Sequence, residues 1–269
     1  MITNDLRSKI QNPALTPYQR IVLLFSILRS PDGCKWDRQQ THQSLVQYLI
    51  EEAYEVVESI ERERYGDLKE ELGDLMTQIV FHAQLAGERG EFTLDDVING
   101  VVDKLVARHP HVFGEAKDLE PEQVRDQWER IKTESGEKDS VLGGLPRTMP
   151  ALTMAFRVGE KAGGVGFDWK QAADVIDKVE EELGELKAEM NSAQRDPARL
   201  TDEIGDLLFA VASLSRKLKV EPEAALRAAL GKFRNRFDEL EKRVRASGRP
   251  MHSYTLEELE AMWQQIKLS

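Results

Sequence analysis

The spacing of apolar residues is helical over most of the chain. One apolar stripe runs from Leu45 through Leu49 and Val56 to Ile60. A longer seam repeats at alternating steps of four and three residues, through Leu226, Leu230, Phe233, Phe237, Leu240 and Val244. Such a seam is typical of a helix that packs lengthwise against another helix. Because strand-like alternation is rare, the pattern predicts an all-α protein.

Two polar residues mark expected helix starts. Asp67 stands three residues before Glu70, which is the spacing of a capping box. Asp196 precedes Pro197, so that an N-cap residue comes before a proline suited to the first helical turn. These signals predict one helix that begins near Asp67 and another that begins at Pro197.

The most informative feature is an internal repeat of charged and aromatic residues. Two acidic pairs in the first half of the chain, E-x-x-E and E-x-x-D, recur in the second half, followed both times by K-x3-R and W-x3-K. The first set is Glu52, Glu55, Glu71, Asp74, Lys104, Arg108, Trp128 and Lys132. The second set is Glu182, Glu185, Glu203, Asp206, Lys232, Arg236, Trp263 and Lys267. The chain therefore contains two copies of one helical unit.

A stretch rich in glycine and proline separates the two copies. It contains Gly143-Gly144, Pro146, Pro150 and Gly163-Gly164, which are typical of turns and loops. We therefore expect a first helical unit over residues 1–134, a linker over 135–166 with a short helix around 152–161, and a second helical unit over 167–269.

Each acidic pair has the spacing that places both carboxylates on one helix face. A solvated acidic face is the simpler interpretation of any single pair. However, Glu52 and Glu182 interrupt apolar stripes, and a carboxylate aimed at a helix interface needs a partner, because burying an unpaired charge is costly. Two antiparallel helices with two acids each would gather four carboxylates around one point. All-oxygen ligands select hard cations such as Mg²⁺ or Mn²⁺.

The cations near these acids have two interpretations. Lys232 and Arg236 lie beside the apolar seam, and Lys178 lies one turn before Glu182. Such residues are commonly solvated surface cations. Beside a carboxylate-bound metal they become candidates for binding phosphate. Trp263 has a spacing that suits either a helix core or stacking on a nucleobase.

Charge and composition narrow the class of function. The 269 residues include 37 Lys and Arg against 48 Asp and Glu, a net charge of −11 that disfavours nucleic acid as a partner. The single cysteine, Cys34, excludes an internal disulfide and a cysteine-rich zinc site. The longest apolar run, residues 21–28, is too short to span a bilayer, and the polar start is unlike a signal peptide. We therefore expect a cytoplasmic protein with no membrane partner.

The duplicated motif set resembles the MazG family of all-α nucleoside triphosphate pyrophosphohydrolases, which is related to the dimeric dUTPases. The resemblance covers nearly the whole chain, including Trp36-Asp37 and Phe167-Asp168-Trp169. It implies a homodimer in which the tandem units pack as four-helix bundles completed by dimerisation. It also implies Mg²⁺-dependent hydrolysis of nucleoside triphosphates to monophosphate and pyrophosphate. The expected physiological role is nucleotide-pool housecleaning, the removal of unwanted nucleotides.

The resemblance also assigns roles to residues of the second unit. The metal and the chemistry would belong to Glu182, Glu185, Glu203 and Asp206. The nucleotide would contact Lys232, Arg236, Trp263 and Lys267. Lys178 is a further candidate from its place one turn before Glu182, where it could bind phosphate or offset the charge of the acids. The first unit is mainly structural in the family, yet all four acids are intact here and form a second candidate metal site: Glu52, Glu55, Glu71 and Asp74.

A rival from another class of function stays open at this point. A non-catalytic helical dimer could bind a regulatory nucleotide or a protein partner through the same surfaces. Metal-dependent release of pyrophosphate from a nucleotide mixture separates the two interpretations. The chain has neither a phosphate-binding P-loop motif nor a Ser-His-Asp arrangement, so we expect no covalent intermediate.

Overall fold

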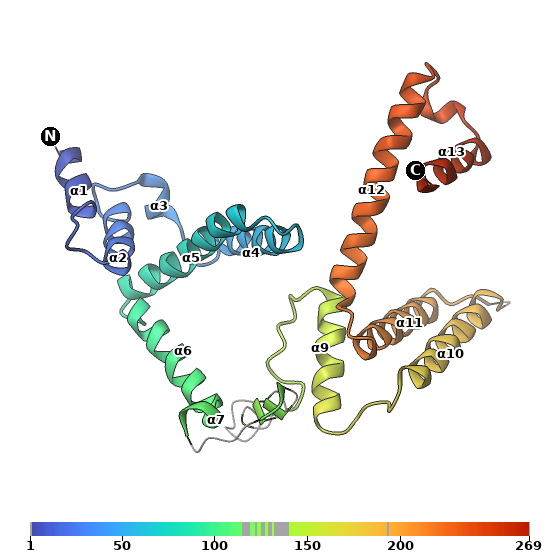
Figure 1. Cartoon of the computed structure of the whole chain (residues 1–269), viewed down its shortest axis with the longest axis horizontal. Helices are drawn as coiled ribbons and strands as arrows, with labels where there is room; N and C mark the ends of the chain where they lie inside the picture. The colour runs from blue at the N-terminus through green and yellow to red at the C-terminus, as the bar shows by residue number, and fades with distance from the viewer. Residues whose placement is uncertain are drawn as a thin grey trace. The chain divides into compact units, whose positions relative to one another are not determined.

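A computed structural model describes residues 2–114, 119–121, 123–124, 127–128, 131, 140–192 and 194–268. Every regular element in these ranges is a helix, which confirms the expected all-α fold (Figure 1). Lys132 and the first residues of the expected linker lie outside the described ranges. The described helices include none with the length and apolarity needed to cross a membrane.

The chain divides into two compact units, residues 1–118 and residues 119–269. The first contains α1 (Ile2–Ile10), α2 (Pro17–Leu28), α3 (Lys35–Gln39), α4 (Val46–Glu61), α5 (Tyr65–Glu88), α6 (Leu94–Arg108) and α7 (Pro110–Phe113). The second contains α9 (Ala151–Gly164), α10 (Ala172–Met190), α11 (Pro197–Lys217), α12 (Pro222–Ala246), the 3₁₀ helix η1 (Met251–Ser253) and α13 (Leu256–Leu268).

The same arrangement of four helices occurs in both units. In the first, α4 and α5 pack against each other, and α2 and α6 both contact α5. In the second, α10 and α11 form the corresponding pair, and α9 and α12 both contact α11. The helix expected within the linker is therefore the counterpart of α2, and its packing on α11 makes it part of the second unit. The structural division at residue 118 thus falls earlier in the chain than the expected boundary at residue 134.

The two expected helix starts have different outcomes. Asp196 is the N-cap of α11, where its side chain accepts a hydrogen bond from the Ala198 backbone N–H, as predicted. A helix does begin near Asp67, at Tyr65, but the expected capping box is wrong, because the N-cap of α5 is Arg64. Asp67 lies in the first turn of α5, 3.0 Å from the guanidinium of Arg64. There its negative charge interacts favourably with the positive end of the helix dipole.

The core of the first unit anchors one end of the α4–α5 pair. Phe25 of α2 packs on Phe81 of α5, with ring centroids 5.2 Å apart. Leu45, at the start of α4, is 1% exposed and belongs to the same cluster. Since α4 and α5 run antiparallel, this core leaves the acidic residues further along α4 near the start of α5.

In the second unit an ion-pair cluster ties the segment before α10 to the end of α11. Asp168 accepts hydrogen bonds from Arg216 and from Lys217, the latter at 2.7 Å. Partial burial alone would raise the pKa of Asp168, but the two cations lower that pKa to about 2. This clamp holds the chain that enters α10 against its partner helix.

The predicted seam on α12 is buried only at its C-terminal end. Leu240 and Val244 pack against Ile266 of α13. In contrast, Leu230 is 60% exposed and Phe233 is 54% exposed in the single chain. Figure 1 shows that α12 runs away from the layer formed by α9, α10 and α11. α13 returns along α12 only as far as the contact of Trp263 with Phe233.

Candidate metal centres

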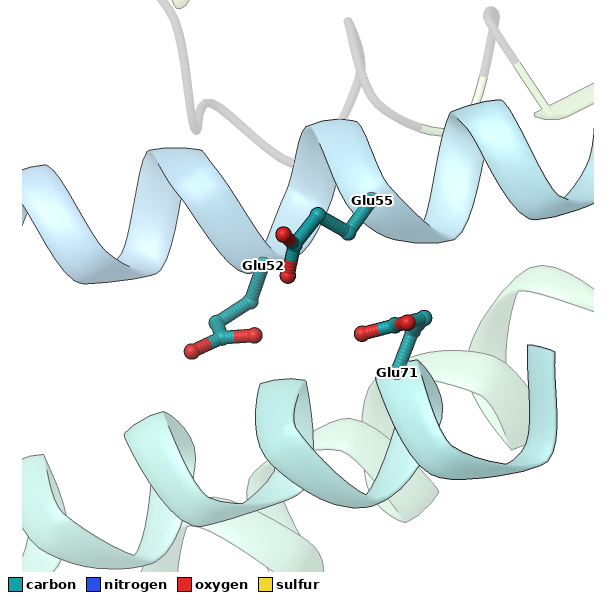
Figure 2. A group of neighbouring side chains, drawn as sticks. All are labelled: Glu52, Glu55 and Glu71. Atoms are coloured by element: carbon teal, nitrogen blue, oxygen red, sulfur yellow. The ribbon is translucent and has the colours of Figure 1, made fainter. Parts of the chain in front are cut away.

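The first acidic centre lies between α4 and α5. Glu52 and Glu55 come from α4 and Glu71 from α5, and one carboxylate oxygen of each lies within 4.8 Å of the others. Figure 2 shows the three side chains turned toward one another across the gap between the two helices. The predicted fourth residue, Asp74, lies outside this group, although its charge acts on both Glu52 and Glu71.

The second acidic centre repeats this geometry between α10 and α11. Glu182 and Glu185 of α10 and Glu203 of α11 have carboxylate oxygens within 4.8 Å of one another. Asp206 again lies outside the group and acts on Glu203 through its charge. The centres differ in depth, because Glu182 is only 5% exposed whereas Glu52 is half-buried.

Burial and the crowding of like charges raise the pKa values of acids in both centres. Desolvation raises the pKa of Glu52, and the charges of Asp74 and Glu55 raise it further. Desolvation followed by repulsion from neighbouring acids likewise raises the pKa of Glu71 and of Glu203. A positive charge placed among the three close carboxylates of either centre would therefore stabilise their ionised form.

The donor set and one unpaired atom fit a divalent cation. Oε2 of Glu182 is buried and has no hydrogen-bond partner among the residues that the structure describes, an unfavourable state for a carboxylate oxygen without a ligand. The donors grouped in both centres are carboxylate oxygens alone, the type that Mg²⁺ and Mn²⁺ prefer. Either centre can thus hold a hard cation between two helices.

Lys178 is bound to the second centre and is not a free surface cation. Its Nζ lies 2.6 Å from Oε1 of Glu182 and 2.8 Å from Oε1 of Glu181. Hydrogen bonds to these two carboxylates raise the pKa of Lys178, so it keeps its charge. The lysine occupies one oxygen of Glu182 and leaves the buried Oε2 for another ligand.

The other predicted nucleotide-binding residues lie on α12 and α13. Lys232 is exposed and Arg236 is half-buried on α12, and the structure records no ion pair between them and the second acidic centre within the described ranges. Trp263 packs on Phe233 with ring centroids 5.0 Å apart and joins the α12–α13 cluster. Lys267 is exposed one turn further along α13. Within one chain these residues therefore form a group apart from the acids.

A family model described as the MazG nucleotide pyrophosphohydrolase domain matches this chain twice, at residues 40–113 and 171–240. The two matches span more than half of the chain and contain all eight predicted acids. The chain belongs to the MazG family. The double match confirms the tandem units, and the family description identifies the chain as a nucleotide pyrophosphohydrolase.

Curated MazG proteins match almost the full length of the chain. A nucleoside triphosphate pyrophosphohydrolase/pyrophosphatase MazG of Thermotoga maritima is 47% identical over 252 residues, which cover 93% of this chain and 95% of the relative. A nucleoside triphosphate pyrophosphohydrolase of Escherichia coli K12 is 43% identical over 252 residues, covering 92% and 96%. YabN, an uncharacterized protein of Bacillus subtilis, is 42% identical over 242 residues, which cover 89% of this chain and 49% of YabN.

The MazG domain matches leave part of the predicted site outside them. They include α4 to α7, α10, α11 and most of α12, and end at residue 240. Trp263 and Lys267 on α13 lie beyond that limit, so their proposed role rests on the W-x3-K motif and not on the domain match.

One charged residue near the second MazG centre was missed in the sequence analysis. Arg199 lies one turn before Glu203 on α11, and its charge partly offsets the desolvation and repulsion that raise the pKa of Glu203. The signal is a spacing of four residues, the same spacing that separates Lys178 from Glu182. A cation thus precedes the first acid on each helix of this centre.

Proposed function

We propose that this MazG chain hydrolyses nucleoside triphosphates to nucleoside monophosphate and pyrophosphate at the second acidic centre, with Mg²⁺ or Mn²⁺ as cofactor. The cation would be held by Glu182, Glu185, Glu203 and Asp206. The observation that carries the proposal is the carboxylate group within 4.8 Å, which includes a buried and unpaired oxygen of Glu182. The names of the Thermotoga and Escherichia relatives support this substrate class. Clearing the nucleotide pool is the physiological role that we propose for this reaction.

Different groups of the centre have different proposed roles in the reaction. A bound divalent cation supplies polarisation of a phosphoryl oxygen and a water of lowered pKa. Lys178 holds Glu182 by one oxygen and so fixes the orientation of the other. A carboxylate oxygen of the same centre that is not bonded to the cation would accept the proton of the attacking water. Lys232 and Arg236, four residues apart on α12, contribute positive charge to bind the triphosphate.

The product pattern tests the proposed reaction. With Mg²⁺ and a mixture of nucleoside triphosphates, the first products are expected to be pyrophosphate and monophosphates, because attack occurs at the α phosphorus. Chelation with EDTA should abolish product release, and Mn²⁺ should restore it. Ion-exchange chromatography of the nucleotides together with a pyrophosphate assay measures this outcome. Orthophosphate and diphosphates as first products, or no turnover at all, would contradict the proposal and favour a non-catalytic binding protein.

We propose further that the chain works as a homodimer. The N-terminal half of α12 exposes a row of large apolar side chains in the single chain, Leu226, Leu230, Phe233 and Phe237. Contiguous apolar surface of this kind is a mark of protein–protein interfaces. A second copy that covers this face would complete the helix packing and surround the α12 cations with protein.

Charge placed on the exposed α12 face tests the dimer. Leu230→Glu is expected to convert the dimer to monomer, because the buried carboxylate would be unpaired at the interface. The matched control is Leu256→Glu, a leucine that is 76% exposed at the start of α13. Size-exclusion chromatography with light scattering reports the mass of each variant. A monomeric wild type, or a Leu230→Glu variant that stays dimeric, would reject this interface.

A further inference from the structure

A pair of stacked histidines lies where the turn before α4 meets the second half of α5. Nδ1 of His42 and Nδ1 of His82 are 2.8 Å apart, and the two rings are nearly parallel, with centroids 5.1 Å apart. His42 belongs to the turn before α4, in which Thr41 and Ser44 exchange hydrogen bonds, and His82 belongs to α5. Neither ring is part of an acidic centre.

The geometry of the histidine pair fixes where its protons lie. One of two ring nitrogens that are 2.8 Å apart must donate a hydrogen, and the other must accept it. Nε2 of His82 is buried and has no hydrogen-bond partner among the described residues, so a proton there would be an unsatisfied buried donor. The shared proton therefore belongs on Nδ1 of His82, which donates to Nδ1 of His42.

A further proton disrupts this arrangement at either ring. On Nδ1 of His42 it would set two donors against each other, and on Nε2 of His82 it would be buried without an acceptor. Burial and, after it, the charge of His42 lower the pKa of His82. The contact between the rings is thus favourable only while both of them are neutral.

The elements around this end of the first unit carry charged and titratable groups of their own. Arg29 pairs with Glu88 at 2.7 Å, and Tyr18 donates a hydrogen bond to Asp95, so these groups are committed to one another. Within the described ranges, the pKa of His82 responds to the charge of His42 and to none of the others. The groups are Tyr18 and the C-cap residue Arg29 of α2, Asp37 and Arg38 of α3, Tyr48 of α4, Glu88 of α5, and Asp95 and Asp96 of α6.

The second unit holds the corresponding end of its helix pair without histidine. Counted from the shared acids, the residues at the two places are Ala172 and Leu214. The clamp of Asp168 with Arg216 and Lys217 lies at that end of the α10–α11 pair. Burial alone would raise the pKa of Asp168, but hydrogen bonds from the two cations bring this pKa to about 2. Mild acid therefore leaves the clamp charged and closed.

We infer that the histidine pair is an acid-sensitive contact, which loosens the first unit at mildly acidic pH while the second unit keeps its structure. The ordinary pKa of histidine is about 6.5, and above it the neutral pair contributes its full stability. As the pH falls below that value, an opened chain takes up a proton that the closed pair excludes, so stability is lost. Opening would release the turn of His42 together with Leu45, which is 1% exposed and anchors the start of α4. The inference does not depend on the hydrolysis proposed for the second centre.

The acids of the first unit do not produce such a loss in mild acid. Because the pKa values of Glu52 and Glu71 are raised, the folded chain binds their protons more tightly than the unfolded chain, and acid stabilises it. The hydrogen bond from Arg29 lowers the pKa of Glu88, so this acid loses its contribution only as the pH falls below about 4.3, the ordinary glutamate value. A loss that begins near pH 6.5 therefore distinguishes histidine from these carboxylates.

Hydrogen exchange of the full-length chain at about pH 7.5 and about pH 5.5 tests the inference. Protection factors, which correct for the intrinsic pH dependence of exchange, report the opening of each backbone segment. Protection over residues 46–50 and 79–85 is expected to fall about tenfold between the two pH values, which is the effect of one excluded proton. Residues 176–180 and 211–217 of the second unit should keep their protection.

Replacement of His82 removes the excluded proton. His82→Leu, which introduces the residue type of Leu214, should make protection of the first unit equal at the two pH values. His82→Asn should do the same, because an amide can donate to neutral His42 or accept from protonated His42. Circular dichroism confirms that each variant folds, and His82→Asn decides alone if His82→Leu does not.

An exposed histidine of the second unit supplies the matched control. His252→Gln should keep the wild-type loss of protection in the first unit. Wild-type protection that is the same at both pH values, or that falls equally in the two units, overturns the inference. A loss that persists in the folded His82 variants overturns it as well.

Discussion

Replacing Glu203 with glutamine is expected to reduce pyrophosphate release roughly a thousandfold. Glu203 is the α11 member of the second carboxylate group, and its loss weakens the hold on the divalent cation. Metal ions contribute several kcal/mol of transition-state stabilisation, and each 1.4 kcal/mol corresponds to about tenfold in rate. Initial rates at saturating Mg²⁺ measure the loss.

The fold should tolerate this substitution. Desolvation and the charges of Glu185, Glu182 and Asp206 raise the pKa of Glu203, which means that the carboxylate is repelled by its neighbours. A neutral amide of nearly the same shape relieves the repulsion. The thermal midpoint without metal should therefore stay at the wild-type value or rise slightly, which separates loss of catalysis from unfolding.

The matched variant Glu71→Gln places the same change in the first unit. Because we assign hydrolysis to the second centre, Glu71→Gln should cost less than about threefold in rate. Comparable losses in the two variants would show two working catalytic centres. Full activity in Glu203→Gln would remove the second centre from the reaction altogether.

Lys178→Met is expected to lower both stability and activity. The methionine leaves Glu182, whose side chain is 7% exposed, without its ion-pair partner. An unpaired buried carboxylate costs about 2 kcal/mol, below the 3–5 kcal/mol of fully buried pairs because the lysine itself is about one-third exposed. Chemical denaturation without metal should show this loss, and hydrolysis should fall about a hundredfold.

A divalent cation and a second lysine provide the controls. Mg²⁺ should recover part of the lost stability in Lys178→Met, because the cation neutralises Glu182 in place of the lysine. Lys232→Met should reduce hydrolysis with no loss of stability, since Lys232 is exposed and no ion pair is recorded for it among the described residues. If Lys178→Met is as stable as wild type, the contact with Glu182 does not support the fold.

Several features of this MazG chain could be predicted because they depend only on spacing along one helix. The i, i+3 pairs place Glu52 with Glu55 and Glu182 with Glu185 on shared faces, and the structure brings each pair to a second helix as expected. The cap at Asp196 followed from the chemistry of an N-cap residue before proline. The double family match confirms the repeat, which is likewise a property of residue order.

Other features could not be predicted because they depend on contacts between helices. The glycine and proline residues of 135–166 predicted a linker, whereas α9 packs on α11 and is the counterpart of α2. The seam on α12 was expected to be packed around Lys232 and Arg236, but Leu230 stays 60% exposed and Phe233, in spite of its contact with Trp263, stays 54% exposed in the single chain. Trp263, for which the spacing left a helix core and base stacking open, packs on Phe233 in the cluster between α12 and α13.

The amino-acid sequence alone determined that the chain is helical, that it is duplicated, and which acids share a helix face. These properties follow from a repeat of 3.6 residues per turn and from residue order, and neither requires a partner helix. Tertiary structure alone decided that Glu182 is buried with one oxygen held by Lys178, and that Asp74 and Asp206 stand outside the close carboxylate groups. It also decided that Oε1 of Gln78 is buried with no hydrogen-bond partner among the described residues. Burial and pairing depend on which helices meet and at what depth, and the spacing along a single helix contains no information about either.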